Sequence, residues 1–328
     1  MKILIIQTAF IGDVILATSL VEQTKAMYPN SEIHFLLRHG NQSLLKYNPH
    51  INKVIVWNKS KSKYSSLIKL ALDARSENYD LLLNIQRFTS SGIFCLLSGA
   101  KITVGFDKNP LSIFFTKQVK HKIPFIKDGE IQHEVQRNAL LLNDALTTAV
   151  KPKLYFSKEE TSKVDALIEK ETPYIVLAPS SVWFTKQWSK EKWIELTKRI
   201  SKNYTLFFIG GPDDKEYIET INQGFGINLC GVLSLTESAY LMKNAQRVLV
   251  NDSAPLHLAS SVNANTTAIF CSTVKDFGYF PLSDNSCVIS TDEELSCRPC
   301  GLHGKKACPL THFKCSETID VNRVIESL

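Results

Sequence analysis

The sequence predicts two successive doubly wound α/β domains, and three observations support this fold class. Its 328 residues are enough for two domains of about 150 residues that each bury a core. Short apolar runs alternate with amphipathic stretches, a pattern typical of βαβ units around a parallel sheet. After an interval that carries Pro and Lys, the same pattern begins again near residue 174. We therefore expect one domain over residues 1–155 and a second over residues 156–328.

The expected strands are short apolar runs bounded by polar residues, Gly or Pro. They lie over 2–6, 32–37, 54–57, 81–85 and 102–106 in the first domain, and over 174–178, 205–209, 227–230, 247–251 and 266–271 in the second. Segments between them carry apolar residues at helical spacing. Helices are expected over 14–27, 65–75, 92–97, 134–146, 190–200, 215–221, 235–244 and 255–261. Such folds bind ligands at the carboxyl ends of the strands and in the cleft between domains.

Composition excludes several classes of protein. With 44% hydrophobic and 21% charged residues, 14 Gly and 12 Pro, the chain is too apolar for a disordered protein and too poor in Gly and Pro for a fibrous one. No apolar run approaches the roughly 18 residues of a membrane span. The N-terminal run meets polar Gln7 at once, unlike a signal peptide. These features predict a cytoplasmic protein.

The net charge is mildly positive, with 38 Lys and Arg against 32 Asp and Glu. The simplest interpretation of this charge is that it keeps the protein soluble. Several lysines are nevertheless grouped, namely Lys59, Lys61 and Lys63, and then Lys117, Lys120, Lys122 and Lys127. Such groups could meet nucleic acid or acidic lipid headgroups. No alternation of aromatic and basic residues typical of RNA-binding motifs accompanies them.

The eight cysteines are unevenly distributed. Cys95, Cys230 and Cys271 lie in apolar stretches and are expected to be small core residues. The others crowd the C-terminus, at Cys287, Cys297, Cys300, Cys308 and Cys315. The last four have the ligand count of a structural zinc site, although their gaps match no standard zinc finger. The alternative is a loop of free thiols, and neither interpretation gives the cluster a catalytic role.

The first loop that could carry chemistry follows strand 2–6 and ends in Gly12-Asp13. Gly12 permits a tight or left-handed backbone. Asp13 is expected near a helix N-terminus, either as a plain N-cap or as a carboxylate that acts as a general base. No G-x-G-x-x-G fingerprint follows the strand, and no G-x-x-x-x-G-K-[ST] motif occurs. A dehydrogenase or a P-loop kinase is therefore disfavoured.

A second loop, over residues 178–188, contains hydroxyl residues and one lysine between a strand and a helix. Lys186 could hold a phosphate as a point charge, and hydroxyls such as that of Thr185 could add hydrogen bonds. The alternative is a solvated loop with Trp183 and Trp188 packed beneath it. For the lysine alone, this alternative is the better interpretation.

A third loop joins strand 247–251 to a helix through Asp252 and Ser253, with Pro255 in the first helical turn. Free backbone N–H groups at such a helix start suit a diphosphate. Asp252 or Ser253 could equally be only the helix cap, and His257 a core histidine.

Together, the three loops resemble the bacterial lipopolysaccharide heptosyltransferases of glycosyltransferase family 9. The matching motifs are Ile-Gly-Asp-Val after the first strand, Ala-Pro-Ser-Ser-Val-Trp-Phe-Thr-Lys-Gln-Trp in mid-chain and Asn-Asp-Ser-Ala-Pro-Leu-His-Leu-Ala later. Supporting matches are Asn84-Ile85-Gln86-Arg87, Gly105-Phe106-Asp107 and His133-Glu134-Val135-Gln136-Arg137-Asn138. The C-terminal Cys-Arg-Pro-Cys-Gly-Leu-His-Gly and Cys-Pro-Leu-Thr-His-Phe-Lys-Cys resemble the heptosyltransferase II branch.

This resemblance implies a GT-B fold, in which two Rossmann-like domains face a central cleft. Residues 1–155 are expected to bind the acceptor and residues 156–328 the nucleotide-sugar donor. The implied reaction is an inverting, metal-independent transfer of heptose from ADP-heptose to the lipopolysaccharide inner core, without a cofactor. The acceptor is lipid-anchored, so the enzyme is expected to contact the inner face of the cytoplasmic membrane peripherally and to bind no nucleic acid.

The resemblance also assigns roles to individual residues. Asp13 matches the family's proposed catalytic base and Lys186 the lysine that contacts the donor diphosphate. Asp252 matches the acidic residue that contacts the donor sugar. The remaining donor-binding residues are Ser253, Ala254 and Leu256 at the phosphate-binding helix start, Thr185 beside Lys186, and Asp213 near the ribose position.

One departure concerns the phosphate loop, where Ala254 and Pro255 replace the Gly that follows Ser or Thr in many relatives. Pro255 also lacks a backbone donor. No D-x-D motif is present to hold a divalent ion. Two alternatives stay open: a family 9 transferase that uses another nucleotide sugar or acceptor, and, in a different class, a nucleic-acid or partner-binding module built on the lysine groups and the Cys loop.

Overall fold

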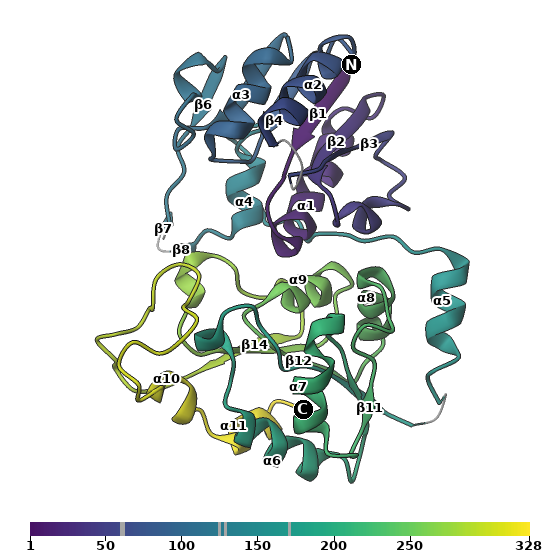
Figure 1. Ribbon diagram of the computed structural model, residues 1–328, viewed down its shortest axis with the longest axis vertical. Helices are drawn as coiled ribbons and strands as arrows, with labels where there is room; N and C mark the ends of the chain where they lie inside the picture. The colour runs from purple at the N-terminus through teal and green to yellow at the C-terminus, as the bar shows by residue number, and fades with distance from the viewer. Residues whose placement is uncertain (60–62, 124–125, 128–129, 170–171) are drawn as a thin grey trace. The chain divides into compact units, whose positions relative to one another are not determined.

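A computed structural model describes residues 1–59, 63–123, 126–127, 130–169 and 172–328. The chain divides into two compact units, Met1–Tyr155 and Phe156–Leu328. Each unit contains a six-stranded parallel sheet, in the order β3-β2-β1-β4-β5-β6 in the first and β11-β10-β9-β12-β13-β14 in the second (Figure 1). The predicted pair of doubly wound α/β domains is therefore confirmed.

The elements of the first unit follow one another as alternating strands and helices. They are β1 (Lys2–Ile6), α1 (Ile11–Met27), β2 (Glu32–Arg38), η1 (Gln42–Leu45), β3 (Lys53–Trp57), α2 (Lys63–Arg75), β4 (Leu81–Asn84), α3 (Thr89–Leu97), β5 (Ile102–Phe106), η2 (Ser112–Phe114), β6 (Lys117–Val119), β7 (Ile126–Lys127), β8 (Glu130–Ile131) and α4 (Glu134–Ala139). Strands β7 and β8 pair with each other as a short antiparallel hairpin.

The second unit repeats this order. Its elements are α5 (Lys158–Asp165), β9 (Tyr174–Ala178), η3 (Phe184–Lys186), α6 (Lys190–Ile200), β10 (Thr205–Phe208), η4 (Pro212–Asp214), α7 (Lys215–Asn222), β11 (Ile227–Asn228), α8 (Leu235–Lys243), β12 (Arg247–Asn251), α9 (Ala254–Ser261), β13 (Thr266–Phe270), η5 (Lys275–Phe277), β14 (Ser286–Ser290), α10 (Lys314–Glu317) and α11 (Val321–Ile325).

The central strand of each sheet is apolar on both faces because helices cover both. In β1, residues 3–6 are fully buried. Leu4 and Ile6 pack into a cluster with apolar side chains of α2 and α3. Successive side chains point to opposite faces, so Ile3 and Ile5 lie on the other face. Such runs without polar alternation are the reason that the strands could be recognised in the sequence.

In each unit the strand order reverses beside the first strand. Strand β1 pairs in parallel with both β2 and β4, and β9 pairs in the same way with β10 and β12. At such a reversal the loops leave the sheet in opposite directions, and a crevice opens at the carboxyl ends of the strands. The segments that follow β1, β9 and β12 carry Asp13 in the first turn of α1, Lys186 at the end of η3, and Asp252 before α9, respectively.

Several sequence expectations were wrong in detail. The helix expected over 134–146 ends at Ala139, because the following residues form turns and Asn143 Oδ1 accepts a hydrogen bond from Ala145 N at 2.9 Å. Gly12 does not have a left-handed backbone; it lies in the first turn of α1. Strands β6 and β14 were not expected, and both lie at sheet edges, where burial is less complete.

The predicted core cysteines Cys95, Cys230 and Cys271 are buried, as expected. Among the described residues, no helix is both long and apolar enough to cross a bilayer. Of the grouped lysines, Lys117 forms an ion pair with Asp144 at 2.8 Å. Lys61, and the side chains of Lys63 and Lys127, lie outside the described residues.

Candidate functional site

In the first unit, Asp13 occupies the third position of α1, where the helix dipole favours a negative charge. The N-cap is Phe10, whose backbone N–H donates to Asp13 Oδ2 at 3.2 Å. Asp13 is therefore not the N-cap itself, although it caps the helix start from inside the first turn. Its side chain is half-buried.

The loop before Asp13 is held by side chains from neighbouring strand ends. Lys59 Nζ donates to the carbonyl oxygen of Thr8 at 2.6 Å, and Asn41 Nδ2 donates to that of Ala9 at 3.2 Å. Gln86, which follows β4, donates a hydrogen bond to Gln7 Oε1. The β1–α1 loop is thus fixed from both sides of the strand reversal.

The surroundings of Asp13 raise its pKa to about 6. Burial is the largest cause, because it disfavours the charged form, and the negative charge of Glu134 adds to it. The Phe10 N–H group and the positive charge of Arg87 oppose the increase without cancelling it. A carboxyl with this pKa can accept a proton near neutral pH, as a general base must.

Glu134, at the start of α4, remains charged. Its burial alone would raise its pKa, but His121 and Arg137 outweigh that effect and lower the pKa to about 2. The Glu134 carboxylate lies 2.8 Å from Arg137 Nε and 3.6 Å from His121 Nε2. His121 Nδ1 is 3.4 Å from Arg87 Nη1. The Glu134 carboxylate therefore stays negatively charged and contributes to the raised pKa of Asp13.

Sequence reasoning gave no role to His121, Glu134 or Arg87. Two of them do lie in motifs noted there, because Arg87 follows β4 and Glu134 begins α4. The available signal was position: polar residues directly after buried strands meet at one edge of a parallel sheet. His121 follows the unexpected edge strand β6, so no sequence signal pointed to it.

In the second unit, the structure brings Lys186 and Asp252 together. Lys186 Nζ lies 2.7 Å from Asp252 Oδ2, and the two side chains are only 14% and 8% exposed. Thr273 Oγ1, after β13, donates to the same carboxylate oxygen at 2.6 Å. Three strand ends, those of β9, β12 and β13, thus contribute to one charged cluster.

Asn251, the last residue of β12, ties two of these loops together. Its Oδ1 accepts a hydrogen bond from Trp188 N at 3.1 Å, and its Nδ2 donates to the carbonyl oxygen of Pro179 at 2.5 Å. Trp188 is buried and packs edge-to-face against Trp193, with ring centroids 5.2 Å apart. The alternative interpretation, a solvated loop with tryptophans packed beneath it, is therefore correct in one part and wrong in another. Trp188 is buried beneath the loop, but Lys186 is ion-paired and mostly buried.

The start of α9 offers few free donors. Ser253 is the N-cap, and its side chain makes no capping hydrogen bond. Ala254 begins the helix, Pro255 has no N–H, and the N–H of Leu256 already bonds to the carbonyl oxygen of Ser253 at 3.0 Å. An anion at this helix start therefore depends on side-chain cations as well as on backbone groups.

Asp213 lies apart from this cluster in its contacts. It is exposed on the short turn η4, beyond the carboxyl end of β10. Its neighbour Asp214 holds the turn, since Asp214 Oδ2 accepts a hydrogen bond from Gly211 N at 2.7 Å.

Thr185 is buried near Lys186 and accepts hydrogen bonds from Ser272 Oγ at 3.1 Å and Lys305 N at 2.8 Å.

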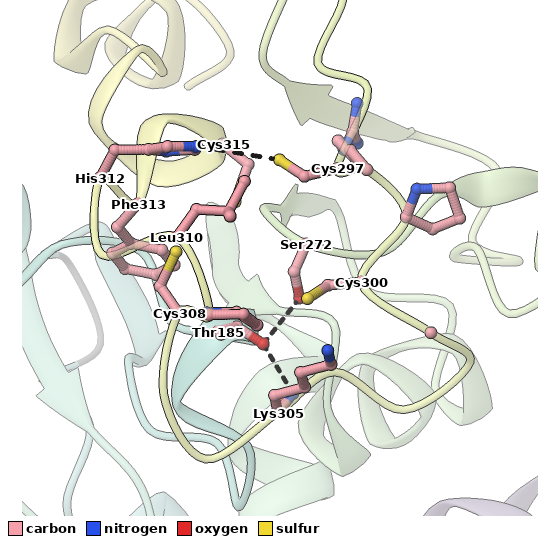
Figure 2. Close-up of a pocket in the computed structure, with 14 residues that line it drawn as sticks. Thr185, Ser272, Cys297, Cys300, Lys305, Cys308, Leu310, His312, Phe313 and Cys315 are labelled. Carbon is pink, nitrogen blue, oxygen red and sulfur yellow. Dashed lines mark hydrogen bonds between the residues drawn. The ribbon is translucent and has the colours of Figure 1, made fainter.

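The C-terminal cysteines surround a cavity of about 300 Å³, shown in Figure 2. It is lined by Cys297, Cys300, Cys308 and Cys315 together with His312, and Thr185 and Lys305 border it. Burial, together with the smaller effects of the other three thiols, raises the pKa of Cys315 to about 11, although the positive charge of Arg298 opposes the increase. Within the described ranges, no three His, Cys, Asp or Glu side chains converge in a group that could hold a metal ion. A structural zinc site therefore stays a hypothesis.

The family model described as "Glycosyltransferase family 9 (heptosyltransferase)" matches residues 67–310. The chain is 26% identical over 291 residues to lipopolysaccharide heptosyltransferase 3 of Escherichia coli, covering 84% of this chain and 85% of that protein. It is 26% identical over 315 residues to lipopolysaccharide heptosyltransferase 1 of Campylobacter coli, with coverage of 90% and 91%.

Among solved structures, the fold is similar to that of the E. coli ADP-heptose lipopolysaccharide heptosyltransferase II. The TM-score is 0.80 at 22% identity, with 100% of this chain and 97% of that chain covered. This likeness and the two parallel-sheet units confirm the GT-B class that the sequence predicted.

Proposed function

Because the chain belongs to glycosyltransferase family 9, we propose that it transfers heptose from ADP-heptose to the inner core of lipopolysaccharide. Relatives named lipopolysaccharide heptosyltransferases support this choice of donor and acceptor. The observation that carries the proposal is the buried Lys186–Asp252 pair beside the start of α9, because a cation beside a helix start supports binding of a sugar diphosphate there. Membership in an enzyme family also replaces the alternative of a nucleic-acid or partner-binding module.

On the acceptor side, Asp13 is the proposed general base. The acceptor hydroxyl oxygen attacks the anomeric carbon of the heptose while its proton moves to the Asp13 carboxylate. The bond from that carbon to the ADP oxygen breaks, and both electrons leave with ADP. One displacement inverts the configuration at carbon. The pKa of about 6 supports this role, because Asp13 is charged at neutral pH and basic enough to accept the proton.

On the donor side, the leaving ADP gains negative charge as the bond breaks. Lys186 and the N-terminal end of α9 are the groups proposed to stabilise that charge. Asp252 is then free to contact the donor sugar when the diphosphate takes over Lys186. We assign Ser253, Ala254, Leu256 and Thr185 to the same donor site and Asp213 to the ribose. No step of this mechanism is assigned to a metal ion.

The proposed acceptor is lipid-anchored, so the enzyme is expected to work at the inner face of the cytoplasmic membrane. Lysines of the first unit, such as exposed Lys120 and Lys122, could contact acidic headgroups there. A family 9 transferase with another nucleotide sugar or acceptor is the runner-up, because the charged cluster around Lys186 would bind any sugar diphosphate.

A donor screen tests the proposed function directly. ADP-heptose at about 100 times its Kd is expected to raise the thermal midpoint by roughly 5–10 °C, since a ligand of the native state stabilises it by mass action. UDP-, GDP- and CMP-sugars serve as controls and are expected to shift the midpoint by less than about 1 °C. Selective stabilisation by a non-heptose donor would instead establish the runner-up.

The pH dependence tests the base. Since the pKa of Asp13 is about 6, kcat/KM is expected to be level above pH 7 and to fall about tenfold per pH unit well below pH 6. The sign follows from the mechanism, because only the unprotonated carboxylate accepts the acceptor proton. Initial rates of transfer between pH 4.5 and 8.5 provide the measurement. A profile that stays level to pH 5 would remove Asp13 from this role.

A further inference from the structure

The C-terminal Cys-rich segment, residues 297–316, docks on the loop that carries Lys186. We call residues 183–188 the donor loop. Three donor-loop residues contact the segment, in the pairs Phe184 with Phe313, Thr185 with Lys305, and Gln187 with Ser316. The two phenylalanine rings stack with centroids 5.0 Å apart. The segment therefore packs directly against the donor loop and is not a separate module.

The segment is also anchored at its other end. The Arg298 guanidinium donates to the carbonyl oxygens of Phe270, Cys271 and Thr273, at 3.2, 2.8 and 2.8 Å. Cys300 N donates to the Ser272 carbonyl oxygen at 2.8 Å. These bonds fix the segment to the carboxyl end of β13, from which Thr273 reaches Asp252.

Between these anchors, Lys305 meets Thr185 directly (Figure 2), and Gly304 precedes it in the chain. Lys305 N donates to Thr185 Oγ1 at 2.8 Å, and Thr185 N donates to the Lys305 carbonyl oxygen at 3.1 Å. A Cβ atom on Gly304 would lie 3.0 Å from Thr185 Oγ1 and 3.2 Å from Lys186 Cγ, and the residue has φ +77°. Only glycine therefore lets the two backbones approach this closely. These hydrogen bonds hold the backbone of Lys305 against Thr185, the residue that precedes Lys186.

A sugar diphosphate carries at least two negative charges, and the site has little free positive charge to meet them. Lys186 is already paired with Asp252 at 2.7 Å, and the first turn of α9 has lost one donor at Pro255 and another to a bond within the turn. Lys305 is exposed and has no ion-pair partner among the described residues.

We infer that Lys305 is a second cation for the diphosphate of the donor, and that its backbone is positioned by hydrogen bonds to the hydroxyl and the backbone N–H of Thr185. This inference rests on the proposed function, because it presupposes a nucleoside diphosphate at the donor loop. The Cys-rich segment thereby completes the donor site. Thr185 contributes to that site by joining the segment to the donor loop, and not only by a contact of its own hydroxyl with the donor.

The test compares ADP affinity by isothermal titration for the wild type, Lys305→Gln, Lys305→Arg and the matched control Lys306→Gln. Lys306 is the exposed neighbour on the same loop, so its loss changes the net charge equally. Loss of one charge-assisted contact is expected to weaken ADP binding roughly tenfold in Lys305→Gln. Lys305→Arg is expected to retain most of the affinity, and Lys306→Gln all of it. An unchanged thermal midpoint of the unliganded Lys305→Gln variant shows that the fold is intact.

The outcomes separate this inference from the proposed function. If the wild type does not bind ADP, the proposed function fails and Lys305 loses its role with it. If the wild type binds ADP and Lys186→Met weakens binding, but Lys305→Gln binds like Lys306→Gln, the inference about Lys305 is overturned while the proposed function stands. An equal loss in both lysine variants also overturns it, because a general charge effect then replaces a contact.

Discussion

Replacing Asp13 by asparagine is expected to lower kcat by roughly 10²- to 10⁴-fold, the usual contribution of a general base. The amide cannot accept the acceptor proton, whereas its oxygen can still accept the hydrogen bond from Phe10 N. Donor affinity is expected to stay within about twofold of the wild type, since the donor-binding residues proposed above belong to the second unit. Steady-state rates with saturating donor and acceptor provide the measurement.

Stability distinguishes this loss of function from a loss of structure. Burial raises the pKa of Asp13, so the native state binds its proton more tightly than the unfolded chain and the charged form is disfavoured in the fold. Asp13 therefore lowers stability progressively as the pH rises from about 4 to about 6, and this loss of stability is constant at higher pH. Asp13→Asn is expected to be at least as stable as the wild type at pH 7. Exposed Asp73→Asn, on α2, is the matched control, and a wild-type kcat in Asp13→Asn would rule out the base.

Most of the fold could be predicted from the sequence because buried parallel strands have a strong local signal. Strands β1, β5, β9 and β12 lie at the predicted positions, and most of their residues are apolar and buried. The edge strands β6 and β14 are only partly buried, so their residues carry no such signal. Beyond the end of α4 at Ala139 the chain forms turns, one of them closed by the Asn143 side chain, and the apolar spacing alone does not reveal this change.

The candidate site was predictable where it lies on loops after strands. Asp13, Lys186 and Asp252 follow β1, β9 and β12, and topology alone directs such loops to one edge of a sheet. The ion pair of Lys186 with Asp252 could not be read from the sequence, because 65 intervening residues must fold before the two meet. The docking of Gly304 and Lys305 on Thr185 has the same origin, since it depends on a tertiary contact across the second unit.

The second large effect is expected at Lys186. Lys186→Met removes one partner of a nearly buried ion pair and leaves the Asp252 carboxylate with the hydrogen bond from Thr273, its one other side-chain partner among the described residues. We expect a loss of roughly 2–4 kcal/mol in the stability of the second unit, because an uncompensated buried charge is costly. ADP binding is expected to weaken at least roughly tenfold, since the diphosphate loses its cation.

A double-mutant cycle with Asp252→Asn separates these two effects. The double variant Lys186→Met/Asp252→Asn removes both charges, so most of the lost stability is expected to return, while ADP affinity stays low. Urea unfolding followed by tryptophan fluorescence reports mainly on the second unit, because Trp183, Trp188 and Trp193 lie there and Trp57 alone lies in the first unit. Lys198→Met, at an exposed position of α6, is the matched control. If the double variant regained ADP affinity together with stability, Lys186 would act only by neutralising Asp252. The proposed direct contact between Lys186 and the diphosphate would then be wrong.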